Sequence, residues 1–352
     1  MLKLRFGPDV EEHTMWVSRV LCLSLLATQA SVSSTAVAQE VRISHQWAEQ
    51  TDARDRAARI FAQEAEMRTR GLKFRIYPNS SFNIKPRELL DALQNEKLEM
   101  AIFPLVYAAP KVPEFSLAGL PGIVPNSAAA KALKSSEVFT MLRSIGEENG
   151  IRILALFWNP GGFLTKSREI SEPKSVEGLR MRVSDPLFGL MLKHVGASAT
   201  MMPSNEIYGA MQSGSLDGVV TTYETILSLK IFEQAKFATV GGPALFMGFS
   251  PLIMSLGTWK RLTPEQQAAV EEAAAISDTY YAWAQRDVEQ RMLTAVRNAG
   301  LSVRRMTSQE YLAWLQVAQQ TAWQEYAKIS PRAQELVVAL VRNILQNVDD
   351  PN

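Results

Sequence analysis

Residues 172–218 contain four segments that decide the fold of this chain. They read EPKSVEGLRMRV (172–183), GA (196–197), EIYGAMQSG (206–214) and LDG (216–218). Patterning predicts a strand over 180–183, helices over 186–195 and 206–212, and a second strand over 217–222. A strand, two helices and a strand at this spacing are typical of a parallel sheet that is covered by helices.

The same alternation extends toward the N-terminus. Strands are expected at 41–45, 73–77, 99–103 and 152–158, and helices at 52–70, 86–95 and 127–145. Pro160, Gly161 and Gly162 interrupt this pattern, which predicts that a second unit begins there. A length of 352 residues also suggests two domains, since one domain usually has about 100–200 residues. The sequence therefore predicts an α/β protein with two domains.

The C-terminal third is mainly helical after an apolar strand expected over 246–256. Thr263 and Pro264 have the residue types of a helix N-cap and first position, and no Gly or Pro follows until Gly300. We therefore expect one uninterrupted helix over 264–299, roughly 54 Å long at 1.5 Å per residue, which could brace two domains. Two further capped helices are expected to begin after Thr307 and Ser330.

Composition excludes several classes of function. The chain has 37 Lys and Arg against 36 Asp and Glu, so its net charge is +1. A nucleic-acid-binding protein would need a strongly basic face. One cysteine and three scattered histidines exclude a Cys-ligated zinc site and a disulfide framework. We therefore expect neither a metal nor a cofactor, and no nucleic-acid partner.

Residues 1–38 are expected to be an export signal. Met15 is followed by Arg19, an apolar run over 20–27 and the small-residue segment AVA at 36–38. The run is shorter than the about 20 residues that span a bilayer. The acidic residues within 1–14 suggest that Met15 is the true start. Cleavage between Ala38 and Gln39 would leave a cysteine-free protein in the periplasm, with no membrane insertion.

The order of the four segments is similar to that of the DctP family of TRAP (tripartite ATP-independent periplasmic) transporter substrate-binding proteins. The family has a strand ending in Arg, a GA turn, a helix with an SE-x-Y-x-A-L/M-Q-x-G pattern and a DG strand in this order. The resemblance extends over residues 41–347 and includes LPG at 120–122. A match of several parts in the correct order is far more specific than any one part.

The resemblance implies a two-lobed, type II-like periplasmic binding protein with hinge strands, a ligand cleft and a long helix crossing both lobes. Lobe I would comprise 39–160 plus about 248–286, and lobe II 161–247 plus about 287–352 with the C-terminal helices. The implied function is a receptor that binds a small organic acid. It would deliver this ligand to the small and large TRAP membrane subunits for uptake driven by an ion gradient.

Arg182 is the strongest candidate for a ligand contact. It lies on the strand 180–183, and in the family the corresponding Arg binds the substrate carboxylate. A guanidinium has two parallel N–H donors at the spacing of the two carboxylate oxygens, which explains this choice of residue. Without the resemblance, a solvated strand residue would be the better interpretation of Arg182.

Five other residues are weaker candidates for the ligand pocket. Trp158 ends the strand expected over 152–158 and Trp47 lies just past the first strand, positions where α/β folds place ligands, although either could equally be a core residue. Thr221 and Tyr223 follow the DG pair, where the family places a polar side chain toward the ligand, often Asn. Phe246 lies in a returning strand near the hinge, where core packing is the stronger alternative. Tyr208 and Gln212 also match the family pattern, but their spacing favours packing.

Two departures from the family bear on the ligand. Acid-specific relatives often have a second Arg where this chain has Gly161 and Gly162, and some have an aromatic ring where it has Ser204 and Asn205. An unpaired buried carboxylate costs several kcal/mol. The sequence thus favours a monocarboxylate with a partly apolar body, such as a 2-oxo, 2-hydroxy or aromatic acid. A C4-dicarboxylate stays open, since Lys85 or Arg87 could supply the second cation.

An enzyme and a sensor are the alternatives to a transport receptor. The chain has no G-x-S-x-G elbow and no phosphate-binding GxxxxGK[ST] loop, and His45 and His194 have no acidic neighbours at ligand spacing. We therefore expect no catalytic residues. A receptor that presents its ligand to a sensor kinase would use the same closed form, so the sequence leaves that alternative open.

Overall fold

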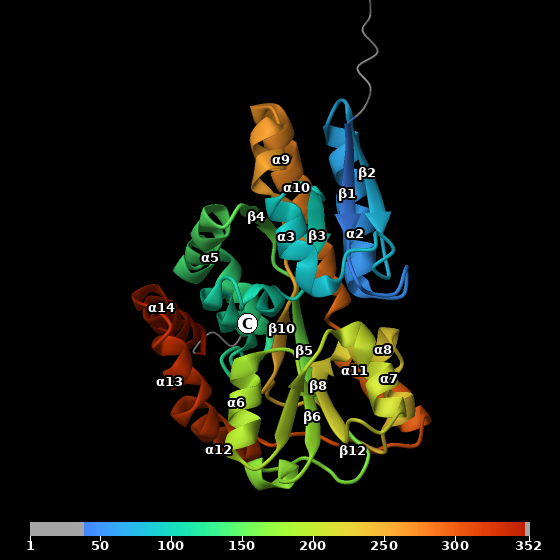
Figure 1. Ribbon diagram of the computed structural model, residues 1–352, viewed down its shortest axis with the longest axis vertical. Coiled ribbons are helices and arrows are strands. Elements are labelled where there is room, and N and C mark those ends of the chain that lie inside the picture. The colour runs from blue at the N-terminus through green and yellow to red at the C-terminus, as the bar shows by residue number, and fades with distance from the viewer. Residues whose placement is uncertain (1–38, 349–352) are drawn as a thin grey trace, which may run out of the picture. The chain divides into compact units, whose positions relative to one another are not determined.

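The computed structural model describes residues 39–348, which form one compact unit with two sheets (Figure 1). The predicted signal peptide, including Met15 and the cleavage site after Ala38, lies outside the described residues. We call the first sheet with its helices lobe I, and the second sheet with its helices lobe II. The domain boundaries expected from the sequence stay a prediction.

Lobe I contains a five-stranded sheet in the order β2-β1-β3-β11-β4. Its strands are β1 (Gln39–Ser44), β2 (Leu72–Tyr77), β3 (Met100–Ile102), β4 (Ile151–Ala155) and β11 (Leu252–Ser255). β1 is parallel to β2 and β3, whereas β11 is antiparallel to both of its neighbours. Helices α2 (Ala53–Arg68) and α10 (Pro264–Ala284) pack against each other beside this sheet (Figure 1). Helices α3 (Leu89–Gln94) and α9 (Leu256–Arg261) contact each other and β4 and β11, and the leucines of α3 belong to a different buried cluster from α2 and α10.

Lobe II contains the second sheet, in the order β12-β9-β5-β8-β6-β7, with β10 paired to β5. Its strands are β5 (Trp158–Thr165), β6 (Arg180–Val183), β7 (Ser198–Met201), β8 (Gly218–Thr222), β9 (Phe237–Thr239), β10 (Met247–Phe249) and β12 (Ser302–Arg304). β6 is parallel to β7 and β8, as the segments 180–183 and 217–222 predict. The helices are α6 (Pro186–His194), α7 (Ile207–Gln212), α8 (Tyr223–Ser228) and α11 (Val288–Asn298).

Two antiparallel segments carry the chain between the lobes. The chain leaves β4 for β5 through residues 156–157 and returns from β10 to β11 through 250–251, where Ser250 N donates to Phe157 O at 2.9 Å. Two predictions need correction here. Gly161 and Gly162 lie inside β5, where they pair with β8, and do not form a break. The strand expected over 246–256 is two strands, because Ser250 and Pro251 separate β10 from β11.

The prediction of one uninterrupted helix over 264–299 is also wrong in detail, because the structure contains two helices in this range. The Thr263–Gln266 capping box is present, but α10 ends at Ala284 and α11 begins at Val288. α10 packs on lobe I, whereas α11 packs on α8 and β12 of lobe II, so each half follows its own core. Arg291 Nη2 donates to the carbonyl of Ala284 at 3.3 Å, which partly satisfies the free carbonyls at this helix end. No Gly or Pro marks this break in the sequence.

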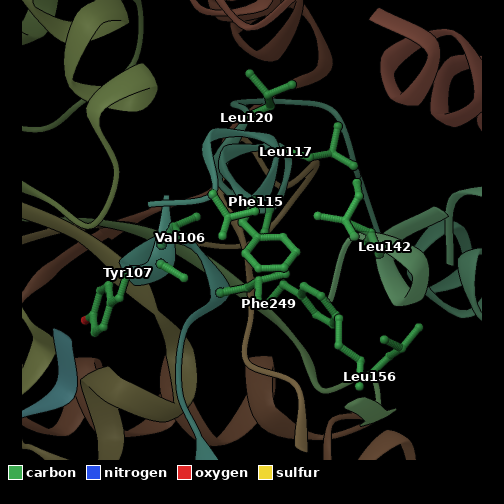
Figure 2. Packing of buried hydrophobic residues seen from close by; sticks show 14 of the residues in the cluster. Val106, Tyr107, Phe115, Leu117, Leu120, Leu142, Leu156 and Phe249 are labelled. Carbon is green, nitrogen blue, oxygen red and sulfur yellow. The ribbon is translucent and has the colours of Figure 1, made fainter. Parts of the chain in front are cut away.

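A third group of helices packs against both lobes. α14 (Pro331–Val348) contacts α4 (Ser127–Ala132) and α5 (Glu137–Glu148), whereas α12 (Ser308–Gln320) and α13 (Ala322–Ala327) contact α6. Figure 2 shows the buried cluster beneath them, in which Phe115 and Phe249 lie together among leucines. Tyr107 lies at the edge of the cluster, and its hydroxyl points away from the other labelled side chains (Figure 2).

Candidate functional site

A cavity with a volume of about 30 Å³ lies between the two lobes. Lobe I and the crossing segment contribute Arg54, Pro104, Val106, Tyr107, Ala118 and Ser250 to its lining. Lobe II contributes Arg182, Ser184, Ser204, Thr221, Thr222 and Thr225, and the returning chain contributes Phe246, Gly248 and Phe249. The lining thus combines two guanidinium groups, a set of hydroxyls and an apolar wall.

Arg182 is a buried guanidinium whose hydrogen-bond partners are all uncharged. Its Nε and Nη2 donate to Met202 O at 3.0 and 2.7 Å, and Nη1 donates to Val220 O at 2.9 Å. A longer contact of 3.4 Å joins Nη2 to the hydroxyl of Tyr107. Burial lowers the pKa of Arg182, but a guanidinium keeps its charge in proteins. The cavity therefore contains a fixed positive charge without a carboxylate partner among residues 39–348.

Arg54 is the second buried guanidinium of the cavity, and it differs from Arg182 because its partner, Asp52, is charged. It lies in the first turn of α2, where its Nε and Nη2 donate to the two carboxylate oxygens of Asp52 at 2.8 and 2.7 Å. Nη2 also donates to Thr225 Oγ1 of lobe II at 3.0 Å, and the guanidinium stacks 3.7 Å above the ring of Trp47. Burial opposes the charge of Asp52, but the Arg54 guanidinium outweighs it and lowers the pKa of this carboxyl. This pair is neutral.

Hydroxyl groups supply the remaining polarity of the cavity. Ser184 Oγ and Ser204 Oγ are buried and have no hydrogen-bond partner among residues 39–348. Buried polar atoms are normally paired, so these two hydroxyls are available to a bound molecule. Thr222 Oγ1, in contrast, donates to Thr225 Oγ1 at 2.9 Å.

Tyr107 connects the lobes at the cavity. Its ring is part of the buried cluster of Figure 2, and its hydroxyl accepts from the backbone N–H of Ser204 at 3.0 Å as well as from Arg182. On the other side of the cleft, Ser228 of lobe II donates to Asp52 of lobe I at 2.8 Å. These contacts can exist only when the lobes are close together, so the structure describes a closed form.

Three of the residues singled out by sequence lie together in this cavity, namely Arg182, Thr221 and Phe246. Gly161 explains part of this arrangement. A β-carbon at Gly161 would lie 2.4 Å from Thr221 O and 2.7 Å from the Phe246 ring, and one at Gly162 would lie 2.5 Å from Thr239 O. An Arg side chain at Gly161 or Gly162 would therefore not fit here without a shift of the strand.

The other three candidates from the sequence, Trp47, Trp158 and Tyr223, lie outside the cavity lining. Trp158 stacks on Phe249, with ring centroids 4.4 Å apart, and Trp47 is fully buried beneath Arg54. Tyr223 is buried in lobe II, where its hydroxyl accepts from the backbone N–H of Gly241. Trp47 and Trp158 each adjoin a lining residue, whereas Tyr223 belongs to a different core. Direct ligand contact by these side chains stays a prediction.

Lys85 and Arg87 line a separate groove outside the cavity, together with Met201, Asn205 and Glu206. Both cations are exposed. The Arg87 guanidinium lies over the Tyr107 ring, 5.7 Å from its centroid. This groove therefore adjoins the cavity at Tyr107, and its two cations remain outside the buried lining.

Sequence reasoning missed several lining residues, above all Arg54 and Tyr107. Arg54 comes two residues after a helix N-cap, Asp52, a position where charged residues are usually solvated. One feature of the sequence could have identified Arg54: the first helix follows a strand predicted to be parallel, and the carboxyl ends of such strands face ligands in α/β folds. Tyr107 lies in a short 3₁₀ turn, Leu105–Ala108, which has no periodic signal. Ser184 adjoins the strand of Arg182 and could have been found by extending that strand.

Two features are absent from the described residues. Over residues 39–348, no group of three or more His, Cys, Asp and Glu side chains could hold a metal ion. No helix in the same range is long and apolar enough to cross a membrane.

Comparisons with known proteins place the chain in a family. Residues 43–329 match the family model for bacterial extracellular solute-binding proteins, family 7, or DctP. A solute-binding protein of Albidiferax ferrireducens is 32% identical over 310 residues, which cover 86% of this chain and 91% of the relative. The C4-dicarboxylate-binding periplasmic protein DctP of Rhodobacter capsulatus is 29% identical, covering 83% and 88%.

Solved structures show the same fold. A TRAP periplasmic solute-binding protein from Rhodoferax ferrireducens with bound malonate superimposes with a TM-score of 0.85 at 30% identity, covering 88% of this chain and 100% of that one. The fold is thus the two-lobed α/β fold of these receptors, as the sequence predicts. The chain belongs to the DctP family of TRAP-type periplasmic solute-binding proteins.

Proposed function

We propose that this protein is a periplasmic receptor that captures a small organic acid between its lobes and delivers it to the membrane subunits of a TRAP transporter. One observation supports the proposal most strongly: Arg182 is buried in the interlobe cavity, and its hydrogen-bond partners carry no negative charge. An unpaired buried charge costs several kcal/mol. A carboxylate on the ligand would offset this cost and fit the guanidinium.

We further propose that the ligand is a monocarboxylate with a 2-hydroxy or 2-oxo group and a partly apolar body. The lining residues Arg54 and Arg182 are two cations, but Asp52 neutralises the first, which leaves one charge to be balanced. Ser184 and Ser204 can hydrogen-bond a hydroxyl or oxo oxygen. The wall of Val106, Phe246 and Phe249 suits an apolar body.

A small dicarboxylate is the second candidate. The relative from Rhodoferax ferrireducens holds malonate, and the relative from Rhodobacter capsulatus is named for C4-dicarboxylates. Arg54 or the nearby Arg87 would then meet the second carboxylate. Calorimetric titration of lactate and pyruvate against malonate, succinate and malate separates the two candidates. Tighter binding of a dicarboxylate than of every monocarboxylate would overturn the monocarboxylate proposal and leave Arg182 as the anchor.

The receptor function itself can be tested with a melting-curve screen of small organic acids. A ligand at 100 times its Kd adds about 2.7 kcal/mol to the free energy of unfolding, which shifts the melting temperature measurably. Failure of every acid would contradict the receptor proposal. Stabilisation by acids together with turnover of ester or amide libraries would favour an enzyme.

We expect ligand binding to favour the closed form, because only this form lets both lobes contact the ligand. The Tyr107–Ser204 and Asp52–Ser228 contacts would form as the lobes approach. Small-angle scattering should show compaction at saturating ligand, and an unchanged radius of gyration would argue against a hinge motion. Ligand-dependent uptake in vesicles with the TRAP membrane subunits would distinguish transport from presentation to a sensor kinase.

A further inference from the structure

Arg54 lines the cavity on the side of lobe I, and Asp52 is its ion-pair partner. Both side chains are buried, with 1% and 0% of their surface exposed. Asp52 caps α2 by accepting from the backbone N–H of Arg54 at 2.9 Å, and it accepts from Ser228 of lobe II. The pair is therefore fixed by its own helix, by the Trp47 ring beneath it and by the opposite lobe.

Arg54 retains unused hydrogen-bonding capacity in this arrangement. Its Nε and Nη2 donate to Asp52 and Thr225, whereas Nη1 has no hydrogen-bond partner among residues 39–348. Arg54 lines the same cavity as Arg182 but comes from the opposite lobe. Nη1 is consequently the donor that Arg54 can offer to a molecule whose carboxylate is held by Arg182.

We propose that Arg54 is a second ligand contact, through Nη1, and that Asp52 is the residue that sets the charge of the ligand this cavity accepts. The proposal rests on the receptor function proposed above. With Asp52 in place, the Arg54 site is neutral and suits the hydroxyl or oxo oxygen of a monocarboxylate. Without the Asp52 carboxylate, the cavity would contain two unbalanced cations and would suit a dianion.

The neighbouring charges leave this balance unchanged. Glu224 of α8 accepts from the backbone N–H of Ala53 at 3.1 Å, but it is paired with Arg291 at 2.8 Å and does not line the cavity. Burial and the nearby Asp52 carboxylate raise the pKa of Glu224. Asp52 is thus the carboxylate directly paired with a cation of the lining.

Asp52→Asn tests the proposal with little change in shape, because Asn caps helices as well as Asp does. We expect the ratio of malonate to lactate affinity, measured by calorimetry, to rise roughly 10-fold or more over wild type. Arg54→Gln, which leaves the carboxylate unpaired, should move the ratio in the opposite direction. The double variant Asp52→Asn/Arg54→Gln removes both charges, so its ratio should return toward the wild-type value. It also provides a test if one of the single variants does not fold.

Asp217→Asn is the matched control. Asp217 makes the same two-oxygen contact with Arg180, at 2.7 and 2.9 Å, on the exposed surface of lobe II away from the cavity lining. This variant also removes one carboxylate from an Arg–Asp pair, so the ratio should stay at its wild-type value. A ratio that moves less than about threefold in folded Asp52→Asn, or moves equally in Asp217→Asn, would overturn the proposal.

A measurement with sulfate separates this proposal from the receptor function. Sulfate is a dianion that carries none of the organic features of a substrate. It should raise the melting temperature of Asp52→Asn more than that of wild type or Asp217→Asn. If no organic acid binds wild type but sulfate shows this difference, the receptor proposal fails and the role of Asp52 stands. If acids bind and neither sulfate nor malonate discriminates the variants, the role of Asp52 fails alone.

Discussion

Arg180 and Arg182 are two residues apart on β6 but lie in opposite environments. Arg180 is exposed and pairs with the carboxylate of Asp217, whereas Arg182 is buried and meets only carbonyls and a hydroxyl. Strand alternation places both on the same face. The difference comes from position along the strand, since Arg182 lies nearer the carboxyl end of β6, on the side of the cavity. The face of a strand therefore does not identify a ligand contact unless the end of the strand is also considered.

The largest expected effect follows from removing Arg182. Truncation of one member of a buried charge pair costs about 2–5 kcal/mol, which corresponds to roughly 30-fold to several-thousand-fold in Kd. We expect Arg182→Ala to weaken carboxylate binding by this amount in calorimetry. Arg182→Lys should restore little, because an ammonium lacks the planar fork.

Arg180→Ala is the control for this prediction. It removes an exposed ion pair, and such pairs contribute about 0–1 kcal/mol. Its Kd should stay within about threefold of wild type. Equal losses in the two variants would show that the contrast between the two arginines has no functional meaning.

Ser184 and Asp185 directly follow β6 and differ in the same way as the two arginines. Ser184 lines the cavity, whereas Asp185 caps α6. Burial raises the pKa of Asp185 to about 7, although N–H groups of Phe188 and Leu187 donate to it. The unfolded pKa is about 3.9. The native state thus binds the extra proton, and this contribution to stability is complete below the unfolded pKa and lost as pH rises toward the folded one.

Asp185→Asn should remove this pH dependence, because Asn keeps the helix cap without the charge. At pH 8 we expect the variant to have a higher free energy of unfolding than wild type. The difference in this free energy between variant and wild type should be larger at pH 8 than at pH 4, by at most about 4 kcal/mol. Denaturant unfolding at both pH values provides the measurement. A difference between variant and wild type that is the same at the two pH values would contradict the assignment to Asp185.

Gly161 and Gly209 offer a further contrast, between a glycine required by packing and one that is not. A β-carbon at Gly161 would collide with Thr221 O and the Phe246 ring, whereas one at Gly209 in α7 meets nothing within 4 Å. Overpacking costs about 1–3 kcal/mol, so Gly161→Ala should lower the free energy of unfolding and weaken ligand binding. Gly209→Ala should be neutral or stabilise by up to about 1 kcal/mol. Unchanged binding in Gly161→Ala would show that Thr221 and Phe246 do not shape the ligand site.

The sequence predicts those parts of this molecule that local chemistry determines. The alternation of strands and helices, the Thr263 and Thr307 caps and the strand of Arg182 all follow from patterning, and the structure contains each of them. The family resemblance then selects Arg182 from the charged strand residues. These features depend on nearest neighbours in the chain or on a motif of fixed order.

The missed features depend on tertiary contacts. Residues 285–287 break the long helix although they include no Gly or Pro, because α10 and α11 follow different cores. Gly161 has the residue type of a loop but lies in a strand, where another strand and the Phe246 ring approach it. Arg54 has the residue type of a solvated first turn but is covered by the opposite lobe. Tertiary packing overrides local preference at each position.

The smallest loss of ligand affinity expected from a lining residue concerns Thr221, which contrasts with Tyr223 two residues later in the chain. Thr221 lines the cavity at the end of β8, whereas the Tyr223 hydroxyl accepts from Gly241 N in the core of lobe II. Thr221→Val keeps the shape and removes a hydroxyl, so it should weaken ligand binding by about 3-fold to 10-fold, or roughly 0.5–1.5 kcal/mol.

Tyr223→Phe leaves a buried N–H without its acceptor and should lower the free energy of unfolding by about 1–3 kcal/mol. Its Kd should not change. Calorimetry and denaturant unfolding of both variants provide the comparison, and a Kd that rises in Tyr223→Phe but not in Thr221→Val would reverse the assignment of these residues to cavity and core.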